Sequence, residues 1–235
     1  MKASTFVLVP GAWHGAWCWR PVAERLRAAG HRAITLTLPG MADGDDPSGL
    51  RLEDAVLYIV DEVRRRNLVD VIFVAHSWGG YPTAAATHVL RGQVSKIVYF
   101  NAQVPLRGRS LIDDNPPSQR ELMLTLIDES PVGAIEPTLS YVEQIFMQDV
   151  APELQRLVAD LLTPQPGRYF LDTLDIDVGT LAIPIVYLAS TDDRAIQWSA
   201  SEFAARAGVQ PVPVPGTHLS MLTHPDQVAA AILAA

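Results

Sequence analysis

Short apolar runs alternate along this chain with segments of helical periodicity, and this alternation constrains the fold more than any other feature. Several runs are apolar at nearly every residue, which is typical of strands in a parallel sheet covered on both faces. The expected strands are 6–9, 33–38, 69–75, 96–101, 183–189 and 210–214, and the expected helices are 21–29, 51–66, 79–91, 198–207 and 225–234. Because such alternation produces right-handed crossovers, the sequence predicts an α/β fold with a doubly wound, mostly parallel sheet.

The alternation stops between about residues 105 and 177. This stretch is rich in proline, and short helical patterns lie between the prolines at about 119–128, 138–149 and 152–162. A helical segment inserted late in a sheet is typical of a lid over an active site. Since 49% of the 235 residues are hydrophobic, the chain has material for one core. We expect a single domain over residues 1–235, with a lid subdomain at about 105–177.

Charge and cysteine content argue against several classes of function. The formal net charge is −8, whereas a nucleic-acid or anionic-membrane partner requires a clustered basic face. The single cysteine, Cys18, excludes an internal disulfide and a multi-cysteine metal site, and it is a weak alternative nucleophile. The first apolar run is broken by Pro10, and no run approaches the roughly 20 residues that span a bilayer. We expect a cytoplasmic protein without nucleic-acid or membrane partners.

Residues 74–81, VAHSWGGY, place a serine directly after an apolar run and before two glycines. A serine hydroxyl becomes a nucleophile when a base removes its proton and nearby donors receive the charge that develops on the substrate. A sharp strand-to-helix turn exposes such a hydroxyl but requires small neighbours, and Ala75 and Gly79 lie two residues before and after Ser77. The following helix would direct the backbone N–H of Trp78 to the site as an oxyanion donor.

The base and the acid are expected later in the chain, because this architecture orders its residues as serine, acid and histidine. His218 follows a short predicted strand and precedes the last helix, which places it at the same sheet edge as Ser77. The acid should follow the strand at 183–189, where Asp192 and Asp193 are adjacent. The spacing alone does not decide between Asp192 and Asp193 as the acid. One of them would accept a hydrogen bond from the imidazole N–H, and the other would cap the turn or face solvent.

Several segments together resemble the α/β-hydrolase superfamily, and within it the branch of plant methylesterases and hydroxynitrile lyases with their bacterial esterase relatives. The segments are FVLVPGAWHGAWCWRPVAERLRAAGHRAITLTLPG, AHSWGG, STDDRAI and GTHLSML. The resemblance covers essentially the whole chain and is weakest in the expected lid. Related enzymes are often dimers, so the resemblance also implies a possible homodimer.

The resemblance assigns roles to individual residues. It implies Ser77 as the nucleophile, His218 as the base, and Asp193 as the acid, because Asp193-Arg-Ala-Ile lines up with the family's Asp-x-x-Ile run. It implies that the N–H of Ala12 joins that of Trp78 in the oxyanion hole. Two departures concern this hole: Pro10 replaces the usual histidine, and Trp78 is bulkier than the usual residue.

The same resemblance separates esterase from lyase. Hydroxynitrile lyases of this branch carry a threonine in the first loop and a lysine directly after the catalytic histidine. Gly11 and Leu219 occupy these positions here. Without the lysine, nothing obvious stabilises cyanide, so lyase activity is disfavoured.

We therefore expect a carboxylesterase that cleaves a small or medium, partly apolar ester through an acyl-enzyme on Ser77, without a metal or organic cofactor. The acidic run at 43–46 is read as a solvated turn. Other bonds on the same site stay open, namely an amide, a lactone, a thioester or a C–C bond, as do a cofactor-free oxygenase and a non-catalytic ligand receptor. The expected pocket residues are Gly11, Trp13, Trp17, Trp19, Trp78, Leu122, Met123, Tyr141, Phe146, Met147 and Leu219.

Overall fold

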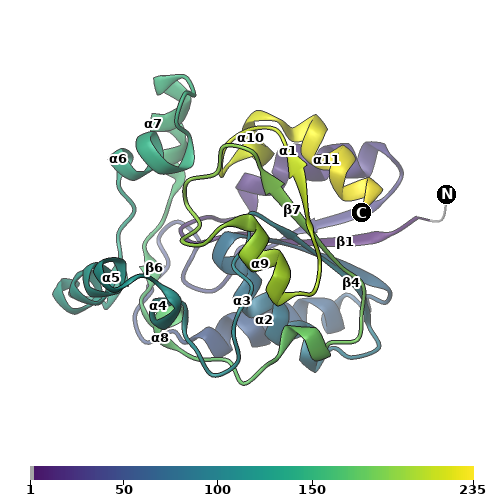
Figure 1. Cartoon of the computed structure of the whole chain (residues 1–235), viewed down its shortest axis with the longest axis horizontal. Helices are drawn as coiled ribbons and strands as arrows, with labels where there is room; N and C mark the ends of the chain where they lie inside the picture. Colours follow the sequence, from purple (N-terminus) through teal and green to yellow (C-terminus); the bar gives the residue numbers. More distant parts are fainter. Residues whose placement is uncertain (1–2) are drawn as a thin grey trace.

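The computed structural model describes residues 3–235, which contain a parallel sheet with the strand order β2-β1-β3-β4-β7-β8 (Figure 1). The strands are β1 (Thr5–Val9), β2 (Arg32–Thr35), β3 (Val71–His76), β4 (Val94–Phe100), β7 (Ile185–Ser190) and β8 (Pro211–Val214). Because β1 pairs with both β2 and β3, the strand order reverses beside β1, as in a doubly wound sheet. The expected fold class is confirmed.

Helices cover both faces of the sheet (Figure 1). One face carries α2 (Leu52–Arg65), α3 (Gly80–Val89) and α9 (Ala200–Arg206), and the other carries α1 (Arg20–Ala28), α10 (Ser220–Thr223) and α11 (Pro225–Ala234). In β1, Val7 and Val9 pack with the first group, whereas Phe6 and Leu8 pack with the second. Burial on both faces explains why the strands are apolar at successive positions.

Between β4 and β7 the chain leaves the sheet and forms a group of short elements at the left of Figure 1. They are α4 (Leu111–Asp114), α5 (Pro117–Glu129), β5 (Ala134–Ile135), α6 (Leu139–Tyr141), the π-helical turn η3 (Val142–Phe146), α7 (Pro152–Leu161), β6 (Gln165–Pro166) and α8 (Arg168–Leu171). β5 and β6 pair antiparallel. We call residues 105–177 the insertion; that it acts as a lid stays a prediction.

All expected strands and helices of the sheet layers are present, with ends that differ by a few residues. The strand expected at 33–38 ends at Thr35, although Leu36 N still donates to Leu8 O at 3.1 Å. The helix expected over 138–149 is instead α6 followed by η3. The elements α4, α8, β5 and β6 were not expected, because two to four residues are too few to show a periodicity.

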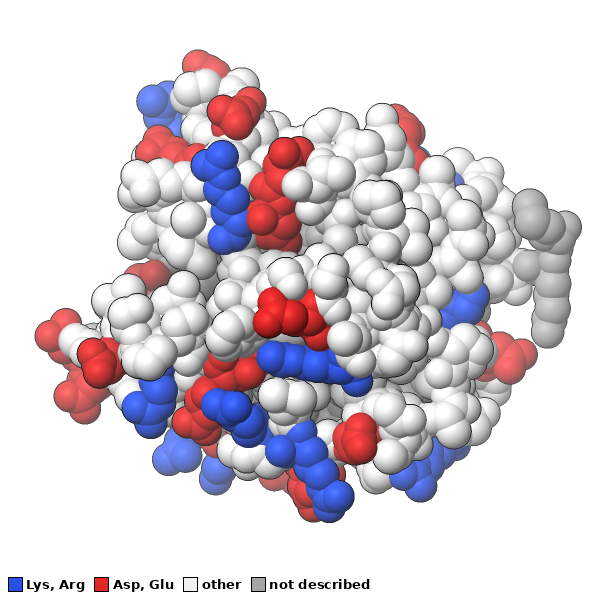
Figure 2. All heavy atoms as spheres, viewed as in Figure 1, with Lys and Arg blue, Asp and Glu red and all other residues white. Residues whose placement is uncertain are grey.

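The surface carries charges of both signs. On the face shown in Figure 2, basic and acidic side chains are interspersed and form no patch of a single sign. No helix within residues 3–235 is long and apolar enough to cross a membrane.

Candidate active site

Ser77 lies at the turn between β3 and α3, at the carboxyl edge of the sheet. Its φ of 52° is in the left-handed region, which is costly for a residue other than glycine. A Cβ on Gly79 would lie 2.4 Å from Pro10 O, and one on Gly80 would lie 2.0 Å from Gln103 O. The two glycines therefore let this turn pack directly against the backbone of the neighbouring loops.

The first loop, residues 10–15, lies against Ser77. A Cβ on Gly11 would lie 2.7 Å from the Cβ of Ser77, so only glycine fits at this contact. Ala12 follows, and it lines the same small cavity as Ser77 and Trp78. The expected nucleophile and the two residues expected to form the oxyanion hole are therefore adjacent.

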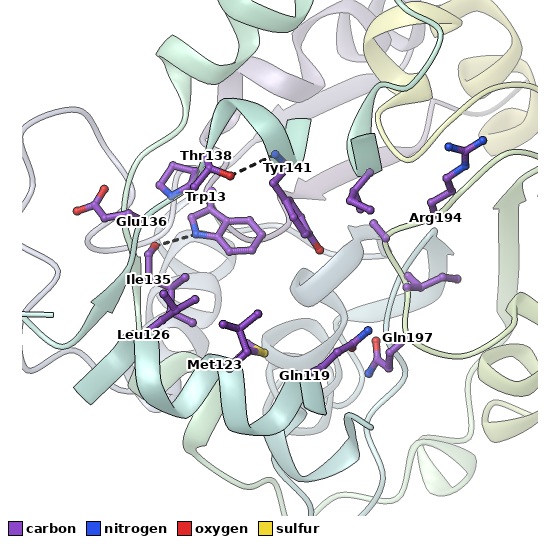
Figure 3. Close-up of a pocket in the computed structure, with 15 residues that line it drawn as sticks. Trp13, Gln119, Met123, Leu126, Ile135, Glu136, Thr138, Tyr141, Arg194 and Gln197 are labelled. Atoms are coloured by element: carbon purple, nitrogen blue, oxygen red, sulfur yellow. Dashed lines mark hydrogen bonds between the residues drawn. The ribbon is translucent and has the colours of Figure 1, made fainter. Parts of the chain in front are cut away.

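Hydrogen bonds from the insertion hold Trp13, whose φ is 64°. Its backbone N–H donates to Oε1 of Gln165 at 3.0 Å, and its carbonyl accepts from Thr163 N at 3.1 Å. Its indole Nε1 donates to Ile135 O at 2.9 Å (Figure 3). The conformation of the first loop is thus fixed by residues more than a hundred positions away.

His218 and Asp193 form a buried pair. Nδ1 of His218 lies 2.9 and 3.0 Å from the two carboxylate oxygens of Asp193, and the side chains are 1% and 5% exposed. When Nδ1 donates to Asp193, Nε2 carries the lone pair. This Nε2 is buried and has no hydrogen-bond partner within residues 3–235. His218 therefore presents one free basic nitrogen.

A polar network fixes the backbone of His218. Its carbonyl accepts from Asn101 Nδ2 at 3.0 Å and from His76 Nε2 at 3.1 Å. Asn101 also donates to Ser190 Oγ at 2.8 Å and accepts from Ser190 N at 2.6 Å. Ser190 Oγ lies 2.7 Å from Ser220 Oγ. The ends of β4 and β7 are thus tied to the loop that carries the histidine.

Asp192 has different surroundings from Asp193. It is exposed, its Oδ2 accepts from Thr191 Oγ1 at 2.8 Å, and its backbone carbonyl accepts from Gln148 Nε2. The structure thus places Asp193, and not Asp192, against His218.

Two more histidines are buried beside His218. The rings of His76 and His218 are 4.5 Å apart, and those of His14 and His76 are 6.0 Å apart. Burial lowers the pKa of His14 to about 4, partly opposed by its hydrogen bond to Ala12 O. Burial, and then the neighbouring His218, lower the pKa of His76 well below its usual range. Both rings are therefore neutral near pH 7.

Two adjoining cavities lie at this edge of the sheet. The inner chamber, of about 80 Å³, is lined by Ala12, Trp13, Ser77, Trp78, Gln103, Leu111, Asn115, Gln119, Met123, Tyr141, Phe146, Phe170, Ala195 and Gln197. The outer chamber, of about 470 Å³, shares six of these residues and is bounded mainly by α5, β5, α6 and the loop after β7 (Figure 3). Charged side chains occur only in the outer lining, as Glu136 and Arg194.

Most of the expected pocket residues line these chambers. Trp13, Met123 and Tyr141 line both, Trp78 and Phe146 line the inner one, and Leu122 lines the outer one. Trp78 stacks on Tyr169 at 4.9 Å, and its Nε1 donates to Tyr169 O at 3.0 Å, so it forms a fixed wall.

Other expected pocket residues lie elsewhere. Gly11 packs against Ser77 and His76 but does not line either chamber. Leu219, Trp19 and Met147 are fully buried in the core, and Trp17 packs against the same core cluster. Their apolar character serves packing, which is the commoner fate of such side chains. Cys18 is also fully buried, and burial raises the pKa of its thiol, so it is not an available nucleophile.

Several lining residues were not expected, chiefly Gln103, Gln119, Gln197 and Phe170. Gln103 follows β4 at the carboxyl edge of the sheet, and the rule that ligands bind at this edge could have identified it. Gln119 and Phe170 belong to the insertion, and no local pattern predicts how its short helices pack.

The acidic run at 43–46 forms a turn in which Asp45 Oδ2 accepts from Ala42 N at 3.2 Å and Asp46 Oδ1 accepts from Ser48 N at 2.9 Å. No group of three or more histidine, cysteine or acidic residues among residues 3–235 is arranged to hold a metal ion.

Comparison with known proteins places this fold in a family. A family model described as "Alpha/beta hydrolase family" matches residues 6–231, so the chain belongs to the alpha/beta hydrolase family. The resemblance stated from the sequence motifs is confirmed.

Individual relatives indicate the class of enzyme. A "Carbendazim hydrolyzing esterase" from Nocardioides sp. (strain SG-4G) is 30% identical and covers 96% of this chain and 97% of its own. "Methylesterase 18" from Arabidopsis thaliana is also 30% identical, over 84% of this chain and 82% of its own. The expected enzyme class, a hydrolase that acts on ester bonds, is confirmed.

Solved structures share the fold. An extracellular alpha/beta-hydrolase from a Paenibacillus species, described as sharing structural and functional homology with Tobacco Salicylic Acid Binding Protein 2, superposes with a TM-score of 0.92 at 24% identity. It covers 99% of this chain and 98% of its own. Polyneuridine aldehyde esterase superposes with a TM-score of 0.75 at 18% identity, again over 99% and 98% of the two chains.

Proposed function

We propose that this protein is a carboxylesterase that works through an acyl-enzyme on Ser77. The observation that carries the proposal is Ser77 itself, which is held in left-handed backbone at a strand-to-helix turn and lines the inner chamber with Ala12 and Trp78. The pairing of His218 Nδ1 with Asp193, which leaves Nε2 free, supports it.

In the first step the oxygen of Ser77 attacks the ester carbonyl carbon while His218 Nε2 accepts the serine proton. The carbonyl electron pair moves onto its oxygen, and the backbone N–H groups of Ala12 and Trp78 stabilise that oxyanion. Asp193 stabilises the imidazolium and fixes its tautomer. When the carbonyl re-forms, the bond to the alcohol oxygen breaks and His218 protonates the leaving alcohol.

In the second step water attacks the acyl-enzyme. His218 Nε2 accepts a proton from the water, and the same oxyanion donors stabilise the second tetrahedral intermediate. Collapse breaks the bond to Ser77, which regains its proton from His218, and the carboxylic acid is released. Since both steps use the same nitrogen, losing the histidine would stop acylation and deacylation alike.

The substrate we propose is an ester of a small alcohol. The similar Arabidopsis proteins are named methylesterases, and the Nocardioides relative is named an esterase. The two chambers together have room for an acyl part larger than acetate, and their lining is mostly apolar. Leu219, which is buried in the core, offers no charge for a cyanide leaving group, so lyase activity stays disfavoured.

Burst kinetics test the proposal. Wild type should release a stoichiometric burst of p-nitrophenol from a short-chain p-nitrophenyl ester, and intact mass should detect an acyl adduct. Ser77→Ala should lose the burst and the adduct and lower kcat by about 10⁴-fold or more. If the variant turns over as fast as wild type, Ser77 is not the nucleophile, and the oxygenase or other base-catalysed reaction becomes the better explanation.

A further inference from the structure

Two glutamines beside Ser77 hold buried polar atoms that the acyl-transfer scheme does not use. Oε1 of Gln103 and Nε2 of Gln197 are buried without a hydrogen-bond partner within residues 3–235. Both residues line the inner chamber together with Ser77. Because folded proteins rarely leave such atoms unpaired, these two are available to hydrogen-bond a polar group of a ligand in the chamber.

Both glutamines are attached to the catalytic framework. Gln103 is 7% exposed, and its backbone N–H donates to Ser77 O at 3.1 Å. Gly80 allows this contact, since a Cβ there would collide with Gln103 O. Gln197 lies four residues after Asp193 on the loop that follows β7. Both glutamines therefore belong to the segments that follow β4 and β7, outside the insertion.

The two amides lie next to each other. Nε2 of Gln103 donates to Oε1 of Gln197 at 3.4 Å, which leaves one carbonyl oxygen and one NH₂ group unpaired. Reversing both amides would exchange their roles but again leave one acceptor and one donor. A group that satisfies both amides must therefore donate a hydrogen bond to the oxygen and accept one from the NH₂ group.

We propose that this glutamine pair recognises a hydroxyl group on the acyl part of the substrate, so that the preferred substrates are esters of hydroxy acids. This inference rests on the proposed esterase function. A hydroxyl oxygen donates and accepts at a single atom, whereas a trans secondary amide directs its N–H and C=O to opposite sides. The inner chamber, of about 80 Å³, suits the smaller group.

The test compares matched methyl esters that differ by one group. Methyl 2-hydroxybutanoate is paired with methyl 2-methylbutanoate, and methyl 3-hydroxybutanoate with methyl 3-methylbutanoate, so that a methyl replaces the hydroxyl. Acid release is followed by pH-stat for wild type, Gln103→Leu and Gln197→Leu. For at least one pair, the ratio of kcat/KM for the hydroxy ester to that for the methyl-branched ester should fall about tenfold in each variant.

Gln210→Leu is the matched control. Gln210 is exposed and lines neither chamber, so solvent satisfies its amide and the ratio should stay at the wild-type value. Turnover of the methyl-branched esters by each variant reports that the fold and the reacting groups are intact. Using the ratio also removes the difference in intrinsic reactivity between the two esters.

The outcomes separate this inference from the proposed function. If neither ratio differs between wild type and the variants Gln103→Leu and Gln197→Leu, while Ser77→Ala still abolishes the acyl adduct, the hydroxyl inference is wrong and the esterase proposal stands. A fall in the Gln210→Leu ratio equal to that of the other two would also overturn it, because the effect would then not depend on the glutamines that line the chamber. If no ester acylates the wild-type enzyme, the proposed function itself fails.

Discussion

Asp192 and Asp193 are adjacent in the sequence, yet only one carboxylate contacts the histidine. Asp193 is buried against His218, whereas Asp192 is exposed and bonded to Thr191. A carboxylate that fixes the imidazole tautomer contributes to every proton transfer, while an exposed turn carboxylate does not.

We expect Asp193→Asn to lower kcat by about 10³- to 10⁴-fold, because the amide can favour the wrong tautomer of His218. Steady-state kinetics on a p-nitrophenyl ester measure the effect. Asp192→Asn is the neighbouring control and should stay within about twofold of wild type, as expected for an exposed side chain. Equal losses of kcat in the two variants would mean that Asp193 is not the acid that orients His218.

At the residue scale, the sequence predicted much of the candidate site but not all of it. Ser77 and His218 were identified by local context and chain order, because both lie where a strand ends. The choice of Asp193 required a family resemblance, since two adjacent carboxylates have the same spacing. Gln103 and Gln197 were not expected, because their place in the chamber lining depends on how the segments after β4 and β7 pack, which no local pattern in the sequence shows.

At the scale of elements, the join between the serine turn and the segment after β4 depends on Gly80. Any side chain there would meet the backbone carbonyl of Gln103 at 2.0 Å, and backbone cannot rotate away as a side chain can. We expect Gly80→Ala to destabilise the protein by about 1–3 kcal/mol and to displace Ser77.

Denaturant unfolding together with kcat measures both consequences. Gly179→Ala is the comparison, because its Cβ would meet only the side chain of Asp177, at 3.3 Å, and it should change stability by less than about 0.5 kcal/mol. A Gly80→Ala protein as stable and active as wild type would contradict the close approach.

A buried ion pair joins α4 to α9. Nη1 of Arg206 lies 2.6 Å from Oδ2 of Asp114, which is 3% exposed, and also donates to Val104 O at 3.1 Å. Arg206→Met would leave the carboxylate buried without its cation, so we expect a loss of about 3–5 kcal/mol in the free energy of unfolding.

The double variant Arg206→Met/Asp114→Leu should recover much of that loss, because no unpaired charge remains. Arg107→Met breaks an exposed pair with Asp175 and should cost less than about 1 kcal/mol. Urea denaturation compares the three. Equal losses in the free energy of unfolding for Arg206→Met and Arg107→Met would contradict the expected difference between the buried and the exposed ion pair.

For the molecule as a whole, the buried histidines set a pH limit on stability. His14 and His76 are neutral in the folded state, because burial lowers the pKa of each, for His14 to about 4. In the unfolded chain both titrate near 6.5. Above that pH these two imidazoles are neutral in both the folded and the unfolded state. Below it they take up protons in the unfolded chain only.

The free energy of unfolding should therefore fall as the pH decreases from about 6.5 toward about 4, by about 1.4 kcal/mol per pH unit for each histidine. Denaturation between pH 7 and 5 measures the slope. His14→Gln should reduce it by about half. An unchanged slope in His14→Gln would refute the assignment.

At this scale the sequence predicted the sheet more completely than the insertion. The strands of the sheet are buried on both faces, and this leaves a continuous apolar signal that a reader of the sequence can find. The insertion is made of short helices and two-residue strands, and η3 departs from the regular helix expected at 138–149. Its packing decides the shape of both chambers, so the pocket could be predicted only in part.

The hydrogen bonds that hold Trp13 have a consequence for recombination between relatives. Two backbone groups and the indole of this one residue bond to Gln165, Thr163 and Ile135, which all belong to the insertion. A chimera that received a foreign segment between β4 and β7 would inherit new pocket walls, but it would also have to supply two acceptors and one donor at these places. Transplants that keep those three partners should fold with the first loop intact, and transplants that lack them should not.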